Sequence, residues 1–287
     1  MKTMILLMSC NQPLYREEEK VCRDTFIQDA EGAGLSYYFY KGLDATHLMQ
    51  CVDNETHTMY IDANDGLGGT GKKTIAALEL SLSEDYDYLI KTNVSTYLNI
   101  GNIVKLIDTL PGRDDTNIYG ARYIVNEYSR NIPFPRGFFA IYSRSVVEGA
   151  VGVGKLLVGK ENMPKTDDTL MCLATLYSLS KELGVNYVSA IKEIPSVWFW
   201  SDEIWDSVEF DEALAIRCKD EENQLDTPEN MRKLHAIVKG KEKPARKGYR
   251  PARYIETAYG TMLYENYLKL AKKIKALREK AKEGDQE

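Results

Sequence analysis

The chain has 287 residues, of which 44% are hydrophobic and 28% charged, and its formal net charge is -6. This composition supports one substantial core, or a large domain plus a small one, and excludes a disordered chain. Five cysteines without paired spacing argue against a disulfide framework or a structural zinc site. The opening apolar run at residues 4–8 is too short for a membrane span or a signal peptide, so we expect a cytoplasmic protein.

Charge is distributed unevenly along the chain. From Arg232 onward, 16 Lys and Arg residues stand against 7 Asp and Glu, so this part is strongly basic and the remainder strongly acidic. Two interpretations stay open. The basic part is a solvated helical tail on an acidic body, or it contacts an anionic membrane surface or a lipid diphosphate, where each basic residue contributes on the order of 1 kcal/mol. No groove-reading motif indicates a nucleic acid partner.

Strand-like and helix-like segments alternate in chain order. Apolar runs predict strands, and apolar side chains at helical spacing predict helices. The predicted strands lie in 3–11, 35–42, 57–65 and 86–93, and the predicted helices in 13–34, 72–85, 100–110 and 166–184. This alternation predicts a doubly wound α/β sheet. Ligands bind beyond the carboxyl ends of such strands, which directs attention to residues 9–11, 62–65 and 91–93.

A Gly-rich segment at residues 66–74 nearly matches a phosphate-binding loop, whose backbone amides wrap phosphates and whose terminal hydroxyl holds magnesium. Lys73 occupies the hydroxyl position, and Thr74 follows one residue late, about 100° further round a helix. A flexible loop before a helix is therefore the favoured interpretation. A P-loop-like NTPase that depends on Lys72 remains an alternative.

Five landmarks in the right order, over residues 1 to about 200, resemble the β-1,3-galactosyltransferase and Fringe-like glycosyltransferases. They are Arg23 and Thr25 in segment 22–26, Asp62 followed by Lys73 and Thr74, the segment 89–99 with Lys91, Thr92, Tyr97 and Asn99, the segment 134–151, and the segment 165–175. The resemblance implies a GT-A-like (Rossmann-like) mixed sheet flanked by helices. Apolar side chains at helical spacing in residues 254–283 predict a C-terminal helical extension. We expect a catalytic domain at 1–240 and a basic connector with a C-terminal helix at 241–287.

In that family, the positions of Asn93, Val94 and Ser95 carry an aspartate cluster that holds a divalent cation on the sugar diphosphate. A hard cation needs carboxylate oxygens, so this degenerate triplet argues against the Mn²⁺ or Mg²⁺ that the resemblance implies, and we assign no cofactor and no metal ligand. Lys and Arg side chains can stabilise phosphate charge instead. The donor-binding candidates are Ser9, Cys10, Asn11, Arg16, Arg23, Asp62, Lys73, Lys91, Thr92, Asn93, Ser95, Arg217 and Lys219.

The adjacent carboxylates Asp167 and Asp168 match the catalytic segment of the family. In an inverting transfer, a carboxylate accepts the proton of the attacking hydroxyl, a role typically worth about 10² to 10⁴ in rate. By the resemblance this base is Asp168, with Asp167 as its neighbour. The same pair also suits the first turn of a helix, where carboxylates are favourable, and the two roles can coexist.

Acceptor-binding candidates come from the resemblance and from aromatic residues. Segment 134–151 resembles the acceptor side of the family and supplies Arg136, Gly137 and Phe138. Trp198 and Trp200 would face the same side of an extended segment and could stack on sugar rings. They could equally be core residues that anchor the sheet to C-terminal helices.

Together these features predict an inverting, metal-independent glycosyltransferase in glycan or polysaccharide biosynthesis. The donor would be a nucleotide sugar, UDP-linked by the resemblance, and the acceptor a glycan or lipid-linked saccharide. Peripheral membrane contact through the basic C-terminus and a homodimer remain open. The alternatives are the P-loop-like NTPase and a catalytically inactive nucleotide or carbohydrate binder.

Overall fold

The computed structural model describes residues 1–121, 123–124, 133–160, 163–197, 212–219 and 226–241. The segment with Trp198 and Trp200 and the predicted C-terminal helix lie outside this part. The strands are β1 (Thr3–Met8), β2 (Ser36–Gly42), β3 (Cys51–Asp53), β4 (Thr58–Ile61), β5 (Tyr88–Asn93), β6 (Thr96–Leu98), β7 (Ile118–Ala121), β8 (Tyr123–Ile124), β9 (Phe134–Pro135), β10 (Phe139–Ser143), β11 (Ile191–Ile194), β12 (Ser196–Val197) and β13 (Ala215–Arg217).

The helices alternate with the strands, as the sequence predicts. They are α1 (Pro13–Cys22), α2 (Gln28–Gly32), α3 (Thr70–Ser81), α4 (Ile100–Ile107), α5 (Arg144–Leu157), α6 (Asp167–Tyr177), α7 (Tyr187–Ala190) and α8 (Thr227–Val238), with a 3₁₀ turn at Leu67–Gly69 and π-turns at Arg23–Ile27 and Ser178–Glu182. The helix predicted within 13–34 is therefore interrupted by a π-turn, in which the Thr25 hydroxyl donates to the Val21 carbonyl at 2.6 Å. In the described ranges no helix has the length and apolar character needed to cross a membrane.

The central sheet is mixed, with mostly parallel strands in the order β11-β7-β10-β5-β1-β2-β4-β3. β1 lies between β5 and β2 and is parallel to both. β10 runs antiparallel between β5 and β7, and the edge strand β3 is antiparallel to β4. The predicted α/β class, a mixed sheet flanked by helices, is confirmed.

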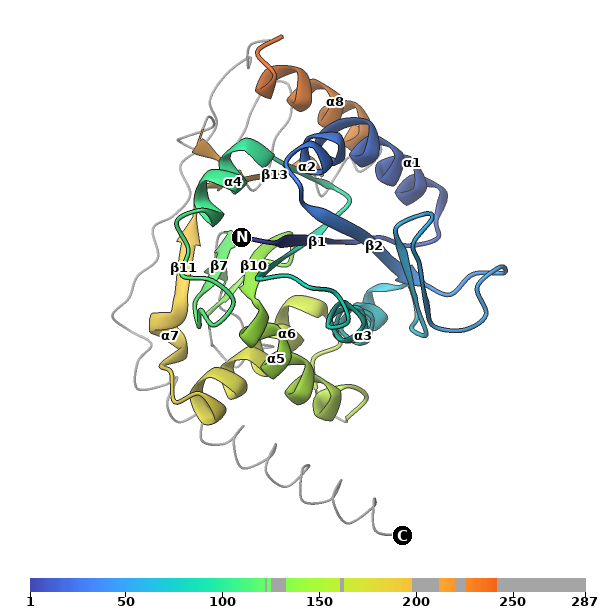
Figure 1. The fold of residues 1–287 in the computed structure, drawn as a ribbon. Coiled ribbons are helices and arrows are strands. Elements are labelled where there is room, and N and C mark those ends of the chain that lie inside the picture. The colour runs from blue at the N-terminus through green and yellow to red at the C-terminus, as the bar shows by residue number, and fades with distance from the viewer. Residues whose placement is uncertain (122, 125–132, 161–162, 198–211, 220–225, 242–287) are drawn as a thin grey trace.

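Helices cover both faces of this sheet, which gives three layers (Figure 1). α1, α2, α4 and α8 lie on one face, and α3, α5 and α6 lie on the other. Along β1, Met4 and Leu6 join the core beneath α3, α5 and α6, whereas Ile5 and Leu7 join the core beneath the opposite helices. Burial on both faces explains why the first strand reads as an unbroken apolar run rather than an alternating one.

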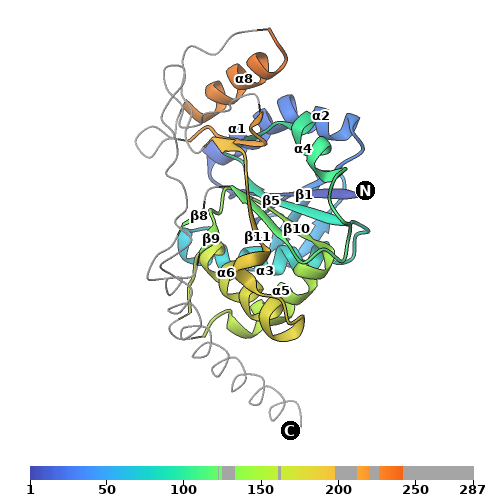
Figure 2. The same ribbon diagram turned by 90° about the vertical axis from the view of Figure 1, so that its left-hand side faces the viewer.

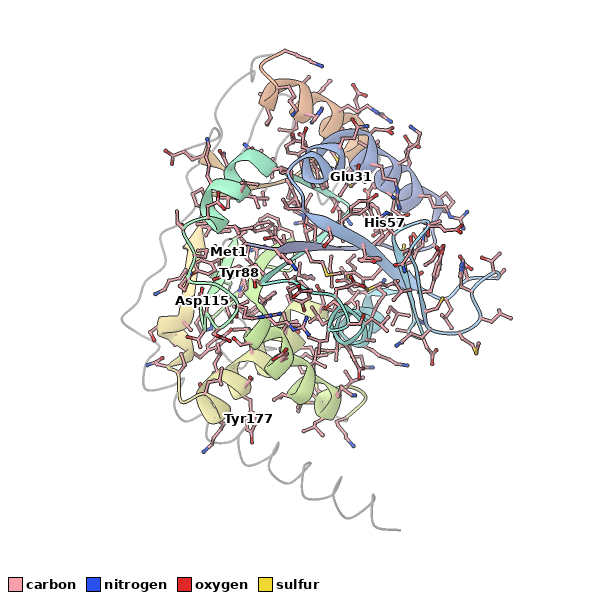
Figure 3. The ribbon with its side chains drawn as sticks, viewed as in Figure 1. Met1, Glu31, His57, Tyr88, Asp115 and Tyr177 are labelled. Atoms are coloured by element: carbon pink, nitrogen blue, oxygen red, sulfur yellow. The ribbon has the colours of Figure 1, made fainter. Side chains whose placement is uncertain are left out.

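Near the amino ends of β5 and β7, buried hydrogen bonds stabilise the fold. The buried Asp115 carboxylate accepts hydrogen bonds from the Tyr88 hydroxyl at 3.0 Å and from the Tyr119 hydroxyl at 2.8 Å. Tyr88 and Asp115 lie near one another in Figure 3. A cleft lies at the opposite end, where the strands have their carboxyl ends. β9 lies beside α6 (Figure 2), and the loop that follows β9 borders this cleft with Gly137 and Phe138.

The Gly-rich segment before α3 is a close-packing motif. A Cβ atom at Gly69 would lie 1.9 Å from the Asn64 carbonyl oxygen, and one at Gly71 would lie 2.8 Å from the Lys165 carbonyl oxygen. The Gly71 N–H donates to that same Lys165 oxygen at 2.8 Å. Glycine therefore lets the start of α3 approach the segment that precedes α6. This packing accounts for Gly69 and Gly71 without a bound phosphate.

Replacing Gly69 with alanine should destabilise the protein by roughly 3 kcal/mol, because the added methyl group meets backbone rather than a flexible side chain. Gly68→Ala is the matched control, since its Cβ would lie 4.0 Å from the nearest atom, on Lys165. Urea unfolding of both variants measures the difference. Equal unfolding free energies for the two variants would contradict the packing role.

Candidate functional site

A cleft of about 310 Å³ opens at the carboxyl ends of β1 and β5. Its walls come from segments that are far apart in the chain, because parallel strands end at the same edge of the sheet. The lining residues that the sequence predicts as site residues are Ser9, Cys10, Lys73, Asn93, Ser95, Gly137, Phe138, Asp167, Asp168, Arg217 and Lys219. The structure therefore brings donor, acceptor and catalytic candidates into one cavity.

Other predicted site residues do not line this cleft, namely Asn11, Arg16, Arg23, Asp62, Lys91, Thr92 and Arg136. The Arg23 guanidinium lies over the Phe39 ring, 4.4 Å from its centroid, and donates to the Thr56 carbonyl at 2.6 Å. Asp62 is largely exposed, and Arg16 borders a separate pocket. Trp198 and Trp200 lie outside the described residues.

Asp65 lines the cleft, whereas the sequence predicts its neighbour Asp62 as the site residue. The Asp65 carboxylate accepts from the Asn11 N–H at 2.9 Å and the Gly42 N–H at 2.6 Å, and it pairs with Lys73 at 2.9 Å. Lys73 is 1% exposed and also donates to the Ser9 carbonyl at 2.7 Å. Asp65 thus joins the ends of β1 and β2 to α3. In the sequence, the position of Asp65 directly before the Gly-rich segment is the feature that could have identified it as a site residue.

A buried ion pair lies at the wall of the cleft, and Asp167, its acidic partner, also lines the cleft. Lys91 on β5 pairs with Asp167 at the start of α6 and donates to the Gly137 carbonyl at 2.6 Å. The Thr92 hydroxyl donates to the Phe138 carbonyl at 2.7 Å. Lys91 and Thr92 therefore hold the 137–138 loop and α6 against β5, and contribute to the cleft through those neighbours.

Asp168 follows Asp167 in the first turn of α6 and lines the cleft. Burial is the largest influence on the pKa of Asp168 and raises it, and the neighbouring Asp167 charge raises it further. Lys91 and the Thr169 N–H, which donates to Asp168 at 2.8 Å, act in the opposite direction. A carboxylate with a raised pKa in a cleft suits proton transfer, while its contact with Thr169 also stabilises the helix start.

The positively charged side of the cleft is formed by Arg217, at the end of β13, and by Lys219 just after it. This strand pairs with β6 so that Arg217 is opposite Thr96, and the Cys218 N–H donates to the Ser95 carbonyl at 2.9 Å. Arg217 and Lys219 are therefore held next to the segment of Asn93, Val94 and Ser95. Burial is the largest cause that lowers the pKa of Lys219, followed by the charge of Arg217. Two cations in a half-enclosed cavity favour an anionic ligand.

The triplet itself does not fit a divalent cation. Asn93 Oδ1 accepts hydrogen bonds from the Ser95 hydroxyl at 2.9 Å and the Thr96 hydroxyl at 2.8 Å, and Val94 is buried. Its oxygens are neutral, whereas Mg²⁺ and similar ions prefer carboxylates. Across the part of the chain that the structure describes, no group of three or more His, Cys, Asp or Glu side chains is placed to hold a metal ion.

No protein-family model matches the sequence, and neither does any curated protein. Similar solved structures include a glycosyltransferase involved in the glycosylation of the major capsid of PBCV-1, with 10% identity, a TM-score of 0.44 and coverage of 81% of this chain and 100% of that one. Another is the mannosyltransferase PcManGT from Pyrobaculum calidifontis with GDP-Man and Mn²⁺, at 10% identity, a TM-score of 0.37 and coverage of 68% and 57%. A third is S. aureus TarS with UDP-GlcNAc, at 11% identity, a TM-score of 0.40 and coverage of 84% and 66%. At these TM-scores the likeness carries no argument about function, which rests on the residues of this chain.

The two lysines of the Gly-rich segment should respond differently to substitution. Lys73→Met should cost about 2 kcal/mol of stability, because it leaves the half-buried Asp65 carboxylate without its ammonium partner. Lys72→Met should change stability by less than about 0.5 kcal/mol, since Lys72 is 52% exposed and lies 3.9 Å from the exposed Asp62. Urea unfolding tests both values. An ATPase activity lost in Lys72→Met would instead support the P-loop alternative.

Proposed function

We propose that this protein is a glycosyltransferase that uses a nucleotide-sugar donor. One observation supports this most directly: a single cleft combines the cations Arg217 and Lys219 with Asp168, a carboxylate whose pKa is raised by burial. Glycosyl transfer from a diphosphate needs both parts, because negative charge develops on the leaving diphosphate while the acceptor hydroxyl loses a proton.

The reaction follows from these two roles. The bond between the anomeric carbon and the donor phosphate oxygen breaks, and its electron pair stays on the diphosphate beside Arg217 and Lys219. The acceptor hydroxyl forms the new bond from the opposite face through an oxocarbenium-like transition state, and its proton passes to Asp168. Attack from the opposite face inverts the anomeric configuration. Lys91 acts indirectly by holding Asp167, and with it the start of α6, in place.

The cleft also suggests where the two substrates lie. Asn93 and Ser95 lie beside the cationic pair, which makes them the candidate contacts for the donor phosphates or ribose. Gly137 and Phe138 form the other wall, where Leu67 is 76% exposed at the rim, so this side suits a saccharide acceptor. We propose a UDP-linked donor and a glycan or lipid-linked saccharide acceptor, both from the family resemblance. Metal-independent transfer follows from the neutral triplet.

The described geometry gives less support to the P-loop alternative. The lysine that would bind phosphate, Lys72, is exposed, and the Thr74 hydroxyl contacts the buried Tyr40 hydroxyl at 3.0 Å. A catalytically inactive nucleotide-sugar binder is the stronger competitor, because the loss of the acidic triplet is the change expected of a protein that has lost turnover. Such a binder would keep Arg217 and Lys219 but would not need Asp168 as a base.

Asp168→Asn should slow transfer, or the slow hydrolysis of a nucleotide sugar, by about 10² to 10⁴ while leaving donor binding intact. In the wild type, kcat/KM should fall as pH decreases through the pKa of Asp168, because only the ionised carboxylate accepts a proton. Since that pKa is raised, the acidic limb should lie above the range of an ordinary aspartate. The same acidic limb and the same rate in Asp168→Asn would exclude Asp168 as the base.

A thermal-shift panel of nucleoside diphosphates and their sugars, each with manganese and with excess chelator, tests the donor class. We expect stabilisation that survives chelation, and a loss of roughly tenfold or more in affinity in Lys219→Ala. Lys20→Ala is the control, because Lys20 on α1 is exposed and paired with the exposed Asp24 of the π-turn that follows. Stabilisation or turnover that appears only with manganese would contradict the metal-independent proposal.

A further inference from the structure

Glu18 is a buried carboxylate on α1 that the proposed reaction does not use. Three consecutive glutamates occur in this helix, and Glu17 is exposed while Glu18 is 2% exposed. Among the described residues, the Glu18 Oε2 atom has no hydrogen-bond partner. Placing such a group away from water is costly, which makes a merely structural role a poor explanation.

Some of the groups around Glu18 line the cleft. Lys219, which follows β13, and Thr227, in the first turn of α8, both interact with the Glu18 carboxylate. Glu18 in turn acts on ionisable groups of the β1 end, of α1 itself and of the segment after β13, which are Cys10, Tyr15, Cys22, Cys218 and Lys219. Cys10, Tyr15 and Lys219 line the cleft, so Glu18 lies directly behind it.

We infer that Glu18 is a positioning residue that takes up a proton when an anionic diphosphate binds beside Lys219, and releases it when that anion leaves. The inference rests on the proposed function, since it requires an anion at Lys219. Only one proton moves, from solvent to the Glu18 carboxylate and back. No other bond changes in this step.

The sign follows from the local charges. Burial is the main cause that raises the pKa of Glu18, to about 7, whereas Lys219 and the Thr227 hydrogen bond lower it. A diphosphate that engages Lys219 adds negative charge nearby and offsets the ammonium, so it should raise the pKa of Glu18 further. By linkage, donor affinity should decline as pH rises through the range near 7, because ionised Glu18 then opposes the anion.

A ligand-free measurement tests the ionisation of Glu18. Between its ordinary pKa and about 7, the folded state should bind a proton that the unfolded state has lost, so stability should decrease from pH 5 to pH 8. Glu18→Gln should reduce this slope and leave the part that comes from the raised pKa of Asp168, whereas Glu17→Gln, the same change on an exposed neighbour, should keep the wild-type slope. Urea unfolding at each pH gives the comparison. An identical slope in Glu18→Gln would overturn the inference.

Calorimetric titration with UDP-N-acetylglucosamine and with GDP-mannose, in two buffers of different ionisation enthalpy, tests the link to binding. The wild type should take up a fraction of a proton near pH 7.5 and bind roughly three- to tenfold more weakly at pH 8 than at pH 6. At pH 6, Glu18→Gln should bind the nucleotide sugar as tightly as the wild type does. At pH 8, it should bind more tightly than the wild type. A merely structural residue would weaken binding at both pH values.

A second variant tests the role of Glu18 without changing Glu18 itself. Thr227→Val removes a hydrogen bond that lowers the pKa of Glu18, so the decline in affinity should move to higher pH. Binding with the wild-type pH dependence in both variants would overturn only the role of Glu18. Failure of the wild type to bind either nucleotide sugar would overturn this inference and the proposed donor class together.

Discussion

The ion pair between Lys91 and Asp167 is the interaction on which the cleft depends. Lys91 lies on β5, next to the central strand, and its buried ammonium group requires a carboxylate partner. Asp167 meets that need, which fixes the start of α6 against the sheet. The next residue, Asp168, is rotated by about 100° on the helix and lines the cleft together with Asp167. Gly137 completes the arrangement, because a Cβ there would lie 3.2 Å from the Asp167 carboxylate.

This constraint separates the cations of the site into two groups. Lys73 and Lys91 are each paired with a carboxylate and a backbone carbonyl, so their charges are largely compensated within the protein. Arg217 and Lys219 come from a different part of the chain, at the end of β13 and just after it, and line the cleft beside Asn93 and Ser95. Lys73 and Lys91 thus shape the cavity, while Arg217 and Lys219 give it a positively charged wall.

The sequence predicts the layers of the fold well, because a strand buried on both faces and helices at regular spacing leave clear patterns, as β1 and α3 show. It also locates the cleft, since Ser9 and Asn93 end neighbouring strands. It does not predict side-chain partners. Lys91 and Asp167 are 76 positions apart, and Asp65 gains its importance from contacts with Asn11 and Gly42. Such pairings depend on three-dimensional register, which local patterns do not encode.

A cleft whose positive charge comes from side chains responds to pH differently from one whose charge comes from a bound metal ion. A divalent ion keeps its charge over the whole physiological pH range, but Lys219 has a pKa lowered by burial and a titrating neighbour in Glu18. The positive wall is therefore coupled to proton binding in a way that a bound cation would not be. Arg217 supplies the constant part of the charge, because a guanidinium stays protonated. The electrostatics of this cleft thus combine one fixed cation with one whose effect depends on the carboxylate behind it.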